Sequence, residues 1–590
     1  MQEQNSTIDY NLGHEVKSTA GAALRKLFRF MKEEQRSLLI AFFVMMVNAG
    51  ITMLTPWFIG YIVDHFIMQK QYGPLLQYSG VLLGLYMVWA GTEYLQAKLM
   101  GGVGQRLLYA LRNEVFNKLQ QLPVAFFNQN RSGDLISRIN NDTDTVNQFF
   151  SQSLMRFMDN IFSMVGVAVF VLSINWKLGG ASLIPAVFIL LFVLLINPWV
   201  KKKNAVSLKA NGNLSADIQE GLHNFKTIIA FNRRDYFREK FATVNEENYK
   251  TAVTAGIANN LFTPVFGFFS NSAQLIVLAL GIYYILEGSF TLGLLISFIS
   301  YVQLFYQPLR ELAALWAGFQ TAMAAWNRIA VILSLRSNLP VIESAAASVT
   351  ARGPVMTFKN VSFRYPDGKK VLHHINFEMQ TGKTYALVGP TGGGKSTTAA
   401  LIARLYDPTE GVVLLNGRDI RSYTAEERTK EIGFILQEPF LFSGSLRDNI
   451  VYGNPQLHAL TDDQLLKAVT DSGLADLLQR FDAGLLTPLG AADTVSLGQK
   501  QLIAFIRAVL CAPKIMILDE ATANIDTVTE KLLDDALKKL PATTTLIVIA
   551  HRLNTIENAD EIFFVNEGEI VPAGTLEHAM DLLLNQKLAS

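Results

Sequence analysis

Residues 384–402 read TYALVGPTGGGKSTTAALI, and this stretch decides the fold of the second half of the chain. An apolar strand runs into the glycine-rich segment 389–396, and a helical run follows it directly. Such a loop needs glycines because bare backbone amides must wrap an anionic phosphate, helped by the positive end of the next helix. The stretch therefore predicts a phosphate-binding loop between a strand and a helix.

The polar residues of this loop have expected roles in binding a nucleotide. Lys395 should reach the outer phosphates, and Ser396 should bind magnesium. The residues expected to contact the nucleotide here are Gly389, Pro390, Thr391, Gly392, Gly393, Gly394, Lys395, Ser396 and Thr397. A chance glycine-rich turn would lack the strand before the loop and the helix after it.

Two later apolar strands also end in side chains that suit nucleotide chemistry. Residues 515–520 read IMILDE, so this strand ends in two carboxylates at the sheet edge where ligands of such sheets bind. Asp519 fits an indirect magnesium contact, and Glu520 fits a base that orients the attacking water. Residues 545–550 (TLIVIA) form a third strand that places His551 to bond a terminal phosphate. The alternative is that the two acidic residues simply lie in a solvent-exposed turn. The phosphate-binding loop upstream disfavours this interpretation.

The first half of the chain is dominated by apolar runs, and 50% of all residues are hydrophobic. Crossing a hydrocarbon core takes roughly 20 helical residues. Runs long enough to do so lie at 37–63, 76–99, 150–174, 178–200, 260–286 and 291–313. Prolines at 56, 185 and 264 interrupt some of them, which membrane helices tolerate because neighbouring groups satisfy the freed backbone. We therefore predict an α-helical six-span transmembrane domain followed by an α/β P-loop nucleotide-binding domain.

The positions of Lys and Arg between the runs predict how the chain is oriented, because cytoplasmic flanks keep the excess of positive charge. The segment before the first run and the connections 100–149 and 201–259 are basic, whereas the loop 64–75 carries only Lys70. The amino terminus and the nucleotide-binding domain should therefore be cytoplasmic, in a multi-pass protein of the cell inner (cytoplasmic) membrane. Residues 22–35 suit an interfacial helix, with a solvated cytoplasmic helix as the alternative.

Composition excludes several other classes of protein. A net charge of +1 offers no basic field for nucleic acid, and the single cysteine, Cys511, excludes an internal disulfide framework and a cysteine-rich zinc site. The polar start of the chain shows no secretory signal. The polar stretch 336–354 (RSNLPVIESAAASVTARGP) predicts a linker between a transmembrane domain at 1–335 and a nucleotide-binding domain at 355–590.

These motifs, in this order, resemble those of an ATP-binding cassette (ABC) half-transporter of the exporter fold over almost the whole chain. Gln437, in FILQEPFLFSGSLRDNI, matches the family's glutamine loop, and Tyr365, in VSFRYPDG, matches the aromatic residue that stacks on adenine. The family signature is matched by Ser496, Leu497, Gly498 and Gln499, and the loop that crosses the dimer interface is matched by Asp526. Residues 126–146 and 217–235 are similar to the two cytoplasmic coupling segments.

The resemblance implies a mechanism and a set of partners. Two such chains would pair, with each ATP between one chain's phosphate loop and the partner's signature serine and glycine. It assigns catalytic roles to Glu520, His551 and Gln437 and magnesium contacts to Ser396, Gln437 and Asp519. Closure on ATP would pass through the coupling segments to the membrane domain as alternating access. ATP and Mg²⁺ are then the cofactors, and the transported molecule is not chemically altered.

Two departures from the family pattern bear on the partner. The usual Leu-Ser-Gly-Gly-Gln is replaced by Val-Ser-Leu-Gly-Gln at 495–499, and Gly-Ala stands at 490–491 where Gly-Glu is usual. Both lie on the surface offered to the partner's ATP, whereas this chain's own phosphate loop, Glu520 and His551 are intact. We expect the catalytically competent member of a heterodimer, with a homodimer as the alternative.

Other functions compete with an exporter that moves a small or amphipathic substrate. A soluble cassette ATPase of DNA repair or translation shares the nucleotide motifs but lacks membrane spans. An exporter-fold importer of a metal chelate or siderophore, and a homodimeric lipid flippase, remain alternatives. Within the spans, Glu93, Arg156 and Asp159 either contact substrate or pair with one another, because ionisable groups are costly there.

Overall fold

The computed structural model describes residues 10, 12, 32–337, 339–342, 353–366, 368–490, 495–519, 526–549, 556–575, 577–579 and 581–582. The chain forms two compact units. The helical unit consists of Glu15–Leu119 and Gly133–Ser334, and the sheet unit consists of Met1–His14, Gln120–Ser132 and Leu335–Ser590. The first predicted coupling segment is therefore divided between them.

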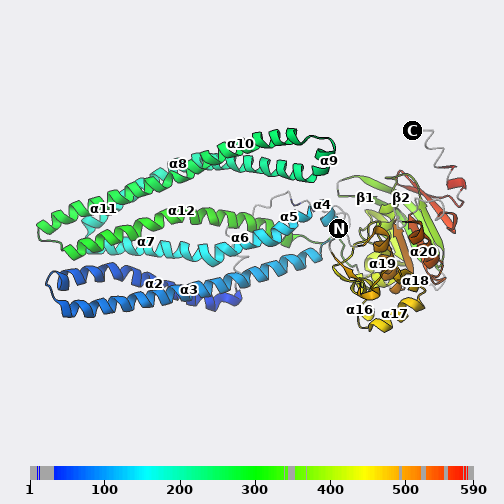
Figure 1. The fold of residues 1–590 in the computed structure, drawn as a ribbon, viewed down its shortest axis with the longest axis horizontal. Coiled ribbons are helices and arrows are strands. Elements are labelled where there is room, and N and C mark those ends of the chain that lie inside the picture. Colours follow the sequence, from blue (N-terminus) through cyan, green and yellow to red (C-terminus); the bar gives the residue numbers. More distant parts are fainter. Residues whose placement is uncertain are drawn as a thin grey trace. The chain divides into compact units, whose positions relative to one another are not determined.

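The helical unit is built from long helices that lie alongside one another (Figure 1). These are α2 (Gln35–Ile62), continued by the π-helix η2 (Val63–Ile67), α3 (Tyr72–Gln120), α7 (Leu154–Ile174), α8 (Trp176–His223), α10 (Arg234–Asn260), α11 (Phe262–Leu286) and α12 (Leu292–Ser334). Shorter segments join them: η1 (Lys32–Glu34), α5 (Ser132–Ser137), η3 (Arg138–Asp142), α6 (Thr143–Gln148), η4 (Phe149–Ser153) and α9 (Phe225–Ala230).

All six predicted runs lie within these helical segments, except for the single residues Leu261 and Thr291 at helix boundaries. Among the described residues, five helical segments are long and apolar enough to cross a membrane: Gln35–Ile67, Ser132–Ile174, Trp176–His223, Arg234–Leu286 and Leu292–Ser334. The run 76–99 lies within α3, where glycine, serine and tyrosine lower its hydropathy. Together these helices confirm the six-span fold. Several continue far beyond their apolar runs.

Proline and glycine shape the helices locally. Pro264 stands in the first turn of α11, where its missing N–H removes no intrahelical bond, and Pro56 and Pro185 lie inside α2 and α8. At the start of α12, Gly293 packs so closely on Gly60 that a Cβ on either would meet the other's carbonyl. Asp64 Oδ1 accepts a hydrogen bond from the Gly293 amide at 2.7 Å, which joins η2 to α12 there.

An ion-pair network ties α5 and η3, which lie within the predicted first coupling segment, to α12. Arg328 pairs with Asp134 at 2.6 Å and with Asp142 at 3.3 Å, and Arg138 pairs with Asp134 at 2.8 Å. Arg138 also donates to the Arg328 carbonyl at 2.9 Å. The helix that leads out of the membrane domain is thereby tied to η3.

The sheet unit alternates short strands with helices, as its sequence predicted. Its strands are β1 (Met356–Arg364), β2 (Lys370–Met379), β3 (Thr384–Val388), β4 (Glu410–Leu415), β5 (Arg418–Asp419), β6 (Ile432–Ile435), β7 (Gly444–Ser445), β8 (Pro488–Leu489), β9 (Ile515–Asp519), β10 (Thr545–Ile549), β11 (Glu561–Asn566) and β12 (Glu569–Pro572). Its helices are α4 (Val124–Gln129), α13 (Lys395–Ile402), η5 (Ile420–Ser422), α14 (Ala425–Glu431), α15 (Leu446–Val451), α16 (Pro455–His458), α17 (Asp462–Asp471), α18 (Ala475–Leu478), η6 (Gly484–Leu486), α19 (Leu497–Leu510) and α20 (Thr527–Leu537).

The strands form an antiparallel sheet in the order β2-β1-β4-β5 and a larger sheet in the order β12-β11-β3-β10-β9-β6. In the larger sheet β11, β3, β10, β9 and β6 run parallel. Ile549 stands opposite both Leu387 and Asp519, and Leu518 stands opposite Ile435. Because these strands end level with one another, the residues that follow them leave from the same sheet edge.

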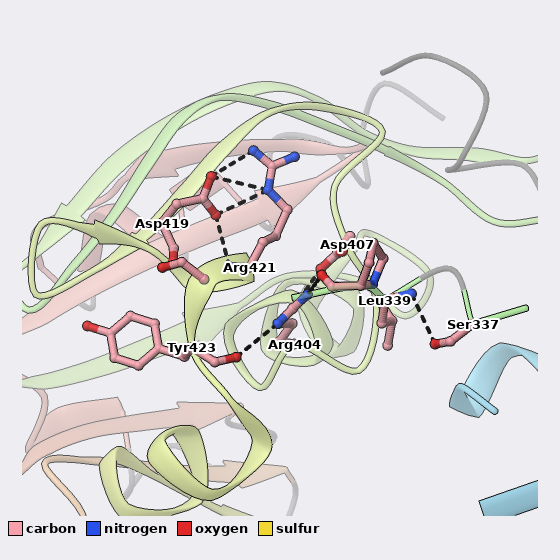
Figure 2. A network of polar contacts seen from close by, with 9 residues as sticks. Ser337, Leu339, Arg404, Asp407, Asp419, Arg421 and Tyr423 are labelled. Atoms are coloured by element: carbon pink, nitrogen blue, oxygen red, sulfur yellow. Dashed lines mark hydrogen bonds and ion pairs between the residues drawn. The ribbon is translucent and has the colours of Figure 1, made fainter. Parts of the chain in front are cut away.

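The sheet unit also holds the chain that follows α12, through a buried arginine (Figure 2). Arg404, after α13, adopts a left-handed backbone with φ +50° and is 2% exposed. Its guanidinium pairs with Asp407 at 3.0 Å and donates to the carbonyls of Tyr423 at 3.2 Å and Pro340 at 2.7 Å. The start of the predicted linker is thereby bonded to the residues just beyond the phosphate-loop helix.

We expect Arg404→Met to destabilise the sheet unit, because it keeps the apolar stem but leaves Asp407 and two carbonyls without their donor. The free energy of unfolding should fall by about 2–4 kcal/mol. Scanning calorimetry of the purified full-length chain measures this loss. Arg447→Met is the matched control, since Arg447 pairs with Asp462 at a more exposed position and should cost about 1 kcal/mol or less. Equal losses in the two variants would contradict the prediction.

Candidate nucleotide site

The phosphate loop has the geometry that its glycines predicted. β3 ends at Val388, and α13 begins at Lys395 with Gly394 as its N-cap. Gly389 has φ +145°, and a Cβ there would collide with the carbonyl oxygen of Val565 on β11. A side chain is therefore excluded by strain and by contact. The loop backbone lies directly against the neighbouring strand.

Lys395 occupies the centre of this loop. Its ammonium donates to the carbonyls of Gly389 at 2.8 Å and Pro390 at 2.9 Å, and the residue is 6% exposed. The cation is thus held where the loop amides and the start of α13 converge. Such an arrangement binds a chain of phosphates, since both the backbone dipoles and the ammonium attract negative charge.

A pocket of about 240 Å³ opens over the loop. It is lined by Tyr365, Lys369, Val371, Thr391, Gly392, Gly394, Lys395, Ser396 and Thr397. The structure thus brings Tyr365 from the end of β1 to the phosphate loop, where its hydroxyl lies 3.0 Å from Thr397 Oγ1. Lys369 and Val371 were not predicted from the sequence. The basic pair at 369–370, in the turn that follows Tyr365, was the available signal.

Most of the other predicted site residues stand at, or just after, the ends of neighbouring parallel strands. Asp519 is the last residue of β9, and Gln437 lies exposed just after β6. Ser396 is exposed to the pocket beside Lys395. Glu520 and His551 follow β9 and β10 in the sequence but lie outside the described residues. The sheet therefore brings the phosphate loop, Asp519 and Gln437 to one edge.

The nucleotide site offers oxygen ligands that suit magnesium, rather than a complete set of protein ligands for a metal ion. Within the described ranges, no group of three or more His, Cys, Asp or Glu side chains is arranged to hold a metal ion. Magnesium at phosphate sites needs only one or two protein oxygens, since the phosphates and water supply the rest. The Ser396 hydroxyl and the Asp519 carboxylate fit that requirement.

The signature residues form the start of α19. Ser496 is the N-cap, and its Oγ accepts from the Gln499 amide at 3.2 Å while Gln499 Oε1 accepts from the Ser496 amide at 3.0 Å. Leu497 is the first helical residue, in a backbone conformation that any residue adopts. Gly498 is buried against Thr529, since a Cβ there would lie 3.3 Å from Thr529 Cγ2. The departure at 497 therefore leaves the helix start intact.

Asp526 caps the neighbouring helix α20. It accepts hydrogen bonds from Thr529 Oγ1 at 2.6 Å and the Thr529 amide at 3.0 Å, and these hold its pKa below the usual value. Arg480 lies 3.5 Å from Asp526 and accepts at its carbonyl from Gln499 Nε2 at 3.1 Å. None of Ser496, Gly498, Gln499 or Asp526 is among the residues that line the described phosphate-loop pocket.

The charged residues within the spans do not pair as one sequence alternative suggested. In the described part of the chain, no ion pair joins Arg156 and Asp159. Instead Glu93 accepts from Asn48 Nδ2 at 2.8 Å, and Glu311 accepts from Asn160 Nδ2 at 3.2 Å. Asp159 lies within electrostatic range of both glutamates. Glu311 was not predicted from the sequence as a charged residue of this group, although it lies two residues before the end of the last apolar run.

Comparison with known proteins agrees with this arrangement over both halves. Residues 38–309 match the family model of the ABC transporter transmembrane region, and residues 372–523 match the ABC transporter model. The ABC transporter ATP-binding protein YfiC of Bacillus subtilis is 31% identical over 97% of this chain and 93% of its own length. A fatty acid ABC transporter ATP-binding/permease protein of Mycobacterium bovis is 31% identical, covering 83% of this chain and 77% of that protein.

An ATP-dependent lipid A-core flippase of Syntrophus aciditrophicus is 29% identical over 94% of this chain and 91% of its own length. Each of these alignments covers at least 83% of this chain and 77% of the relative, so each extends over both the membrane region and the ATPase region of this chain. Fusion of the two regions, together with the phosphate loop on its strand and helix, supports ATP hydrolysis as the source of energy. The chain therefore belongs to the ABC transporter family, as an exporter-type half-transporter with one membrane domain and one ATPase domain.

Proposed function

We propose that this chain is one half of an ATP-driven exporter that moves a small or amphipathic substrate across the cytoplasmic membrane by alternating access. The observation that carries the proposal is the pocket lined by Tyr365, Lys395 and Ser396, in a chain that also has six apolar runs, five of which lie in helices long and apolar enough to cross a membrane. The membrane domain is assigned to 1–335, the linker to 336–354 and the ATPase domain to 355–590. The Lys and Arg distribution supports a cytoplasmic amino terminus and ATPase.

Each residue of the nucleotide site has a role in hydrolysis. Tyr365 offers a ring for the base, and the loop amides with Lys395 hold the phosphates. Bound magnesium, contacted by Ser396 with Asp519 and Gln437 nearby, would neutralise phosphate charge. Glu520 orients the attacking water and takes its proton, and His551 bonds the terminal phosphate.

Substitution of two of these residues should separate binding from hydrolysis. Glu520→Gln should keep ATP affinity near normal but lower turnover by a factor of about 10²–10⁴, the usual range for a positioned base. Lys395→Ala should weaken ATP binding itself, because the site loses its ammonium. Fluorescent nucleotide titration and phosphate release on the purified, assembled transporter measure the two effects. Undiminished turnover in Glu520→Gln, or wild-type ATP affinity in Lys395→Ala, would remove that residue from its role.

A second chain is needed to complete the ATP site, and we propose that it differs from this one. The signature residues lie outside this chain's own pocket, which supports a site shared between two chains. A homodimer would present Leu497 to both ATP molecules, whereas a heterodimer confines the departure to one site. Ala491 lies outside the described residues. The partner would then have an intact signature and a substituted glutamate at the end of its own acidic strand.

Expression of this chain alone tests the heterodimer. We expect little ATPase activity from the single chain and activity on co-expression with a second half-transporter. Size-exclusion chromatography with light scattering identifies the assembled species, and phosphate release measures its turnover. A stable homodimer with substantial ATPase activity that transported compounds stimulate would contradict the proposal and favour a homodimeric flippase.

We further propose that the substrate is cationic. Glu93, Asp159 and Glu311 come from α3, α7 and α12; Glu93 accepts a hydrogen bond from the neutral amide of Asn48, and Glu311 accepts from those of Asn160 and Gln307. Carboxylates at membrane depth are costly unless a positive charge offsets them. The Oδ1 atom of Asn48, whose amide nitrogen bonds Glu93, is a buried acceptor without a donor. A lipophilic ammonium compound would supply both the charge and the donors.

Uptake of tetraphenylphosphonium and ethidium into inside-out vesicles tests both the direction and the charge preference. ATP-dependent uptake would show export, and we expect Asp159→Asn combined with Glu93→Gln to weaken it at least about tenfold, the factor for 1.4 kcal/mol. Glu287→Gln, in an exposed turn outside the spans, is the control and should transport normally. Uptake only into right-side-out vesicles would indicate an importer. Equal transport by the double variant would contradict a cationic site.

A further inference from the structure

Two residues near the start of the chain, Tyr10 and Leu12, are buried against the end of α4. They belong to the sheet unit, as do α4 and the residues that follow α12. Tyr10 is fully buried and Leu12 is 7% exposed. Residues near a chain end are ordered only where other parts of the protein hold them. The sheet unit must therefore contain a site that receives this segment.

Two consecutive side-chain amides at the end of α4 hold the backbone of this segment. The Tyr10 amide donates to Gln129 Oε1 at 2.8 Å, and the Leu12 amide donates to Asn130 Oδ1 at 3.2 Å. Asn130 Nδ2 donates to the Tyr10 carbonyl at 3.0 Å and to the Phe126 carbonyl at 2.8 Å. A primary amide offers a donor and an acceptor together, so Asn130 can bond an N–H and a C=O of the segment at once.

The side chain of Tyr10 makes the contact specific for tyrosine. Its ring packs edge to face on the buried ring of Phe126, at 6.2 Å and 88°. Its hydroxyl donates to the Arg336 carbonyl at 2.9 Å, two residues beyond the end of α12. A phenylalanine would fill the same space on α4 but would not bond Arg336, because it lacks the hydroxyl. The ring therefore contacts α4, and the hydroxyl contacts the start of the linker.

Tyr10 joins two segments that are far apart in the sequence. α4 lies between α3 and α5, whereas Arg336 follows α12. Within the described ranges, no hydrogen bond or ion pair runs directly from α4 to residues 335–337. The hydrogen bonds between these two parts of the chain therefore pass through Tyr10.

We propose that the end of α4 and the Arg336 carbonyl form a binding site for a short tyrosine-containing peptide, which residues 10–12 occupy as a tether between the two segments. Gln129 and Asn130 bind the peptide backbone, Phe126 receives the ring, and the Arg336 carbonyl accepts from the hydroxyl. Because the described hold consists of one buried ring and four hydrogen bonds, it is reversible, and a free peptide of the same sequence can replace the segment.

Peptide binding to the purified, assembled transporter tests the site. A variant that lacks residues 1–13 should bind a fluorescent peptide of residues 6–15, STIDYNLGHE. The intact chain should bind this peptide at least about tenfold more weakly, because its own segment occupies the site at a high effective concentration. A Tyr10→Phe peptide should bind about fivefold more weakly than the natural sequence, the factor for one net hydrogen bond. A Tyr10→Ala peptide should bind about 100-fold more weakly, since the buried ring is lost as well.

Fluorescence polarisation measures the binding, with a scrambled peptide of the same composition as the control. Absence of binding to the shortened chain, equal binding to the intact chain, or equal binding of the scrambled peptide would overturn the proposed site. The measurement needs no nucleotide, so failure of the proposed ATP site would leave its result unchanged.

Hydrogen exchange on the full-length chain tests the tether without a deletion. Tyr10→Phe should speed amide exchange in residues 335–342 about fivefold, because the bond to the linker is lost. Exchange in residues 124–130 should change little, since the ring still packs on α4. Asn130→Ala should also speed exchange in residues 335–342, although Asn130 makes no described hydrogen bond to them, because it loosens the hold on Tyr10.

Asn141→Ala is the matched control for the asparagine. Asn141 Nδ2 bonds the Ser137 hydroxyl at 3.2 Å at an exposed position away from this site, so exchange in residues 335–342 should stay as in the wild type. Unchanged exchange there in Tyr10→Phe, or equal acceleration in Asn141→Ala, would contradict the tether.

Discussion

The close contact between the phosphate loop and the neighbouring strand β11 is the constraint on which the rest of the site depends. Side chains are excluded at Gly389 and Gly393 because the carbonyl oxygen of Val565 lies against both positions. The Gly393 carbonyl in turn accepts a hydrogen bond from the Gly568 amide at 3.1 Å. The loop is thereby held against β3 and β11, which pair in parallel. Because the loop is held there, the position at which α13 begins is fixed as well.

Because the loop is fixed in this way, α13 is a short rigid helix that connects the phosphate loop to the residues that follow it. Its start holds Lys395, and its end leads into Arg404, which bonds the chain that follows α12, and into Tyr406, which bonds α4. The two segments that lead toward the membrane helices, residues 120–132 and 335–342, therefore meet the ATPase domain next to the same helix. A movement at the phosphate site can therefore affect both segments through α13 alone, since this helix is only about two turns long.

Sequence reasoning succeeded where the signal is local and failed where it depends on tertiary neighbours. The phosphate loop and the six runs are contiguous, so their glycines, strand, helix and hydropathy predict them directly. The charged neighbours of Asp159, which are Glu93 and Glu311, could not be predicted, because an i, i+3 spacing with Arg156 does not indicate which helices pack alongside. Asn128 and Tyr406 lie 278 residues apart, and neither belongs to a motif that implies the other. The basic pair at 369–370 was visible in the sequence, but the place of Lys369 at the pocket depends on how β2 follows Tyr365.

The geometry of α19 refines what the unusual signature implies. Phosphate is bound at a helix start by backbone amides, which a leucine carries as well as a glycine does. Leu497 is the first helical residue and keeps the cap between Ser496 and Gln499, so the donors of this helix start are retained. What changes is the shape of the half-exposed side chain at that point. We infer that the departure acts on how closely a partner's ATP can approach, which would slow hydrolysis at that site without abolishing binding. The departure at 497 would then lie in the shape of a side chain rather than in a different fold of the signature helix.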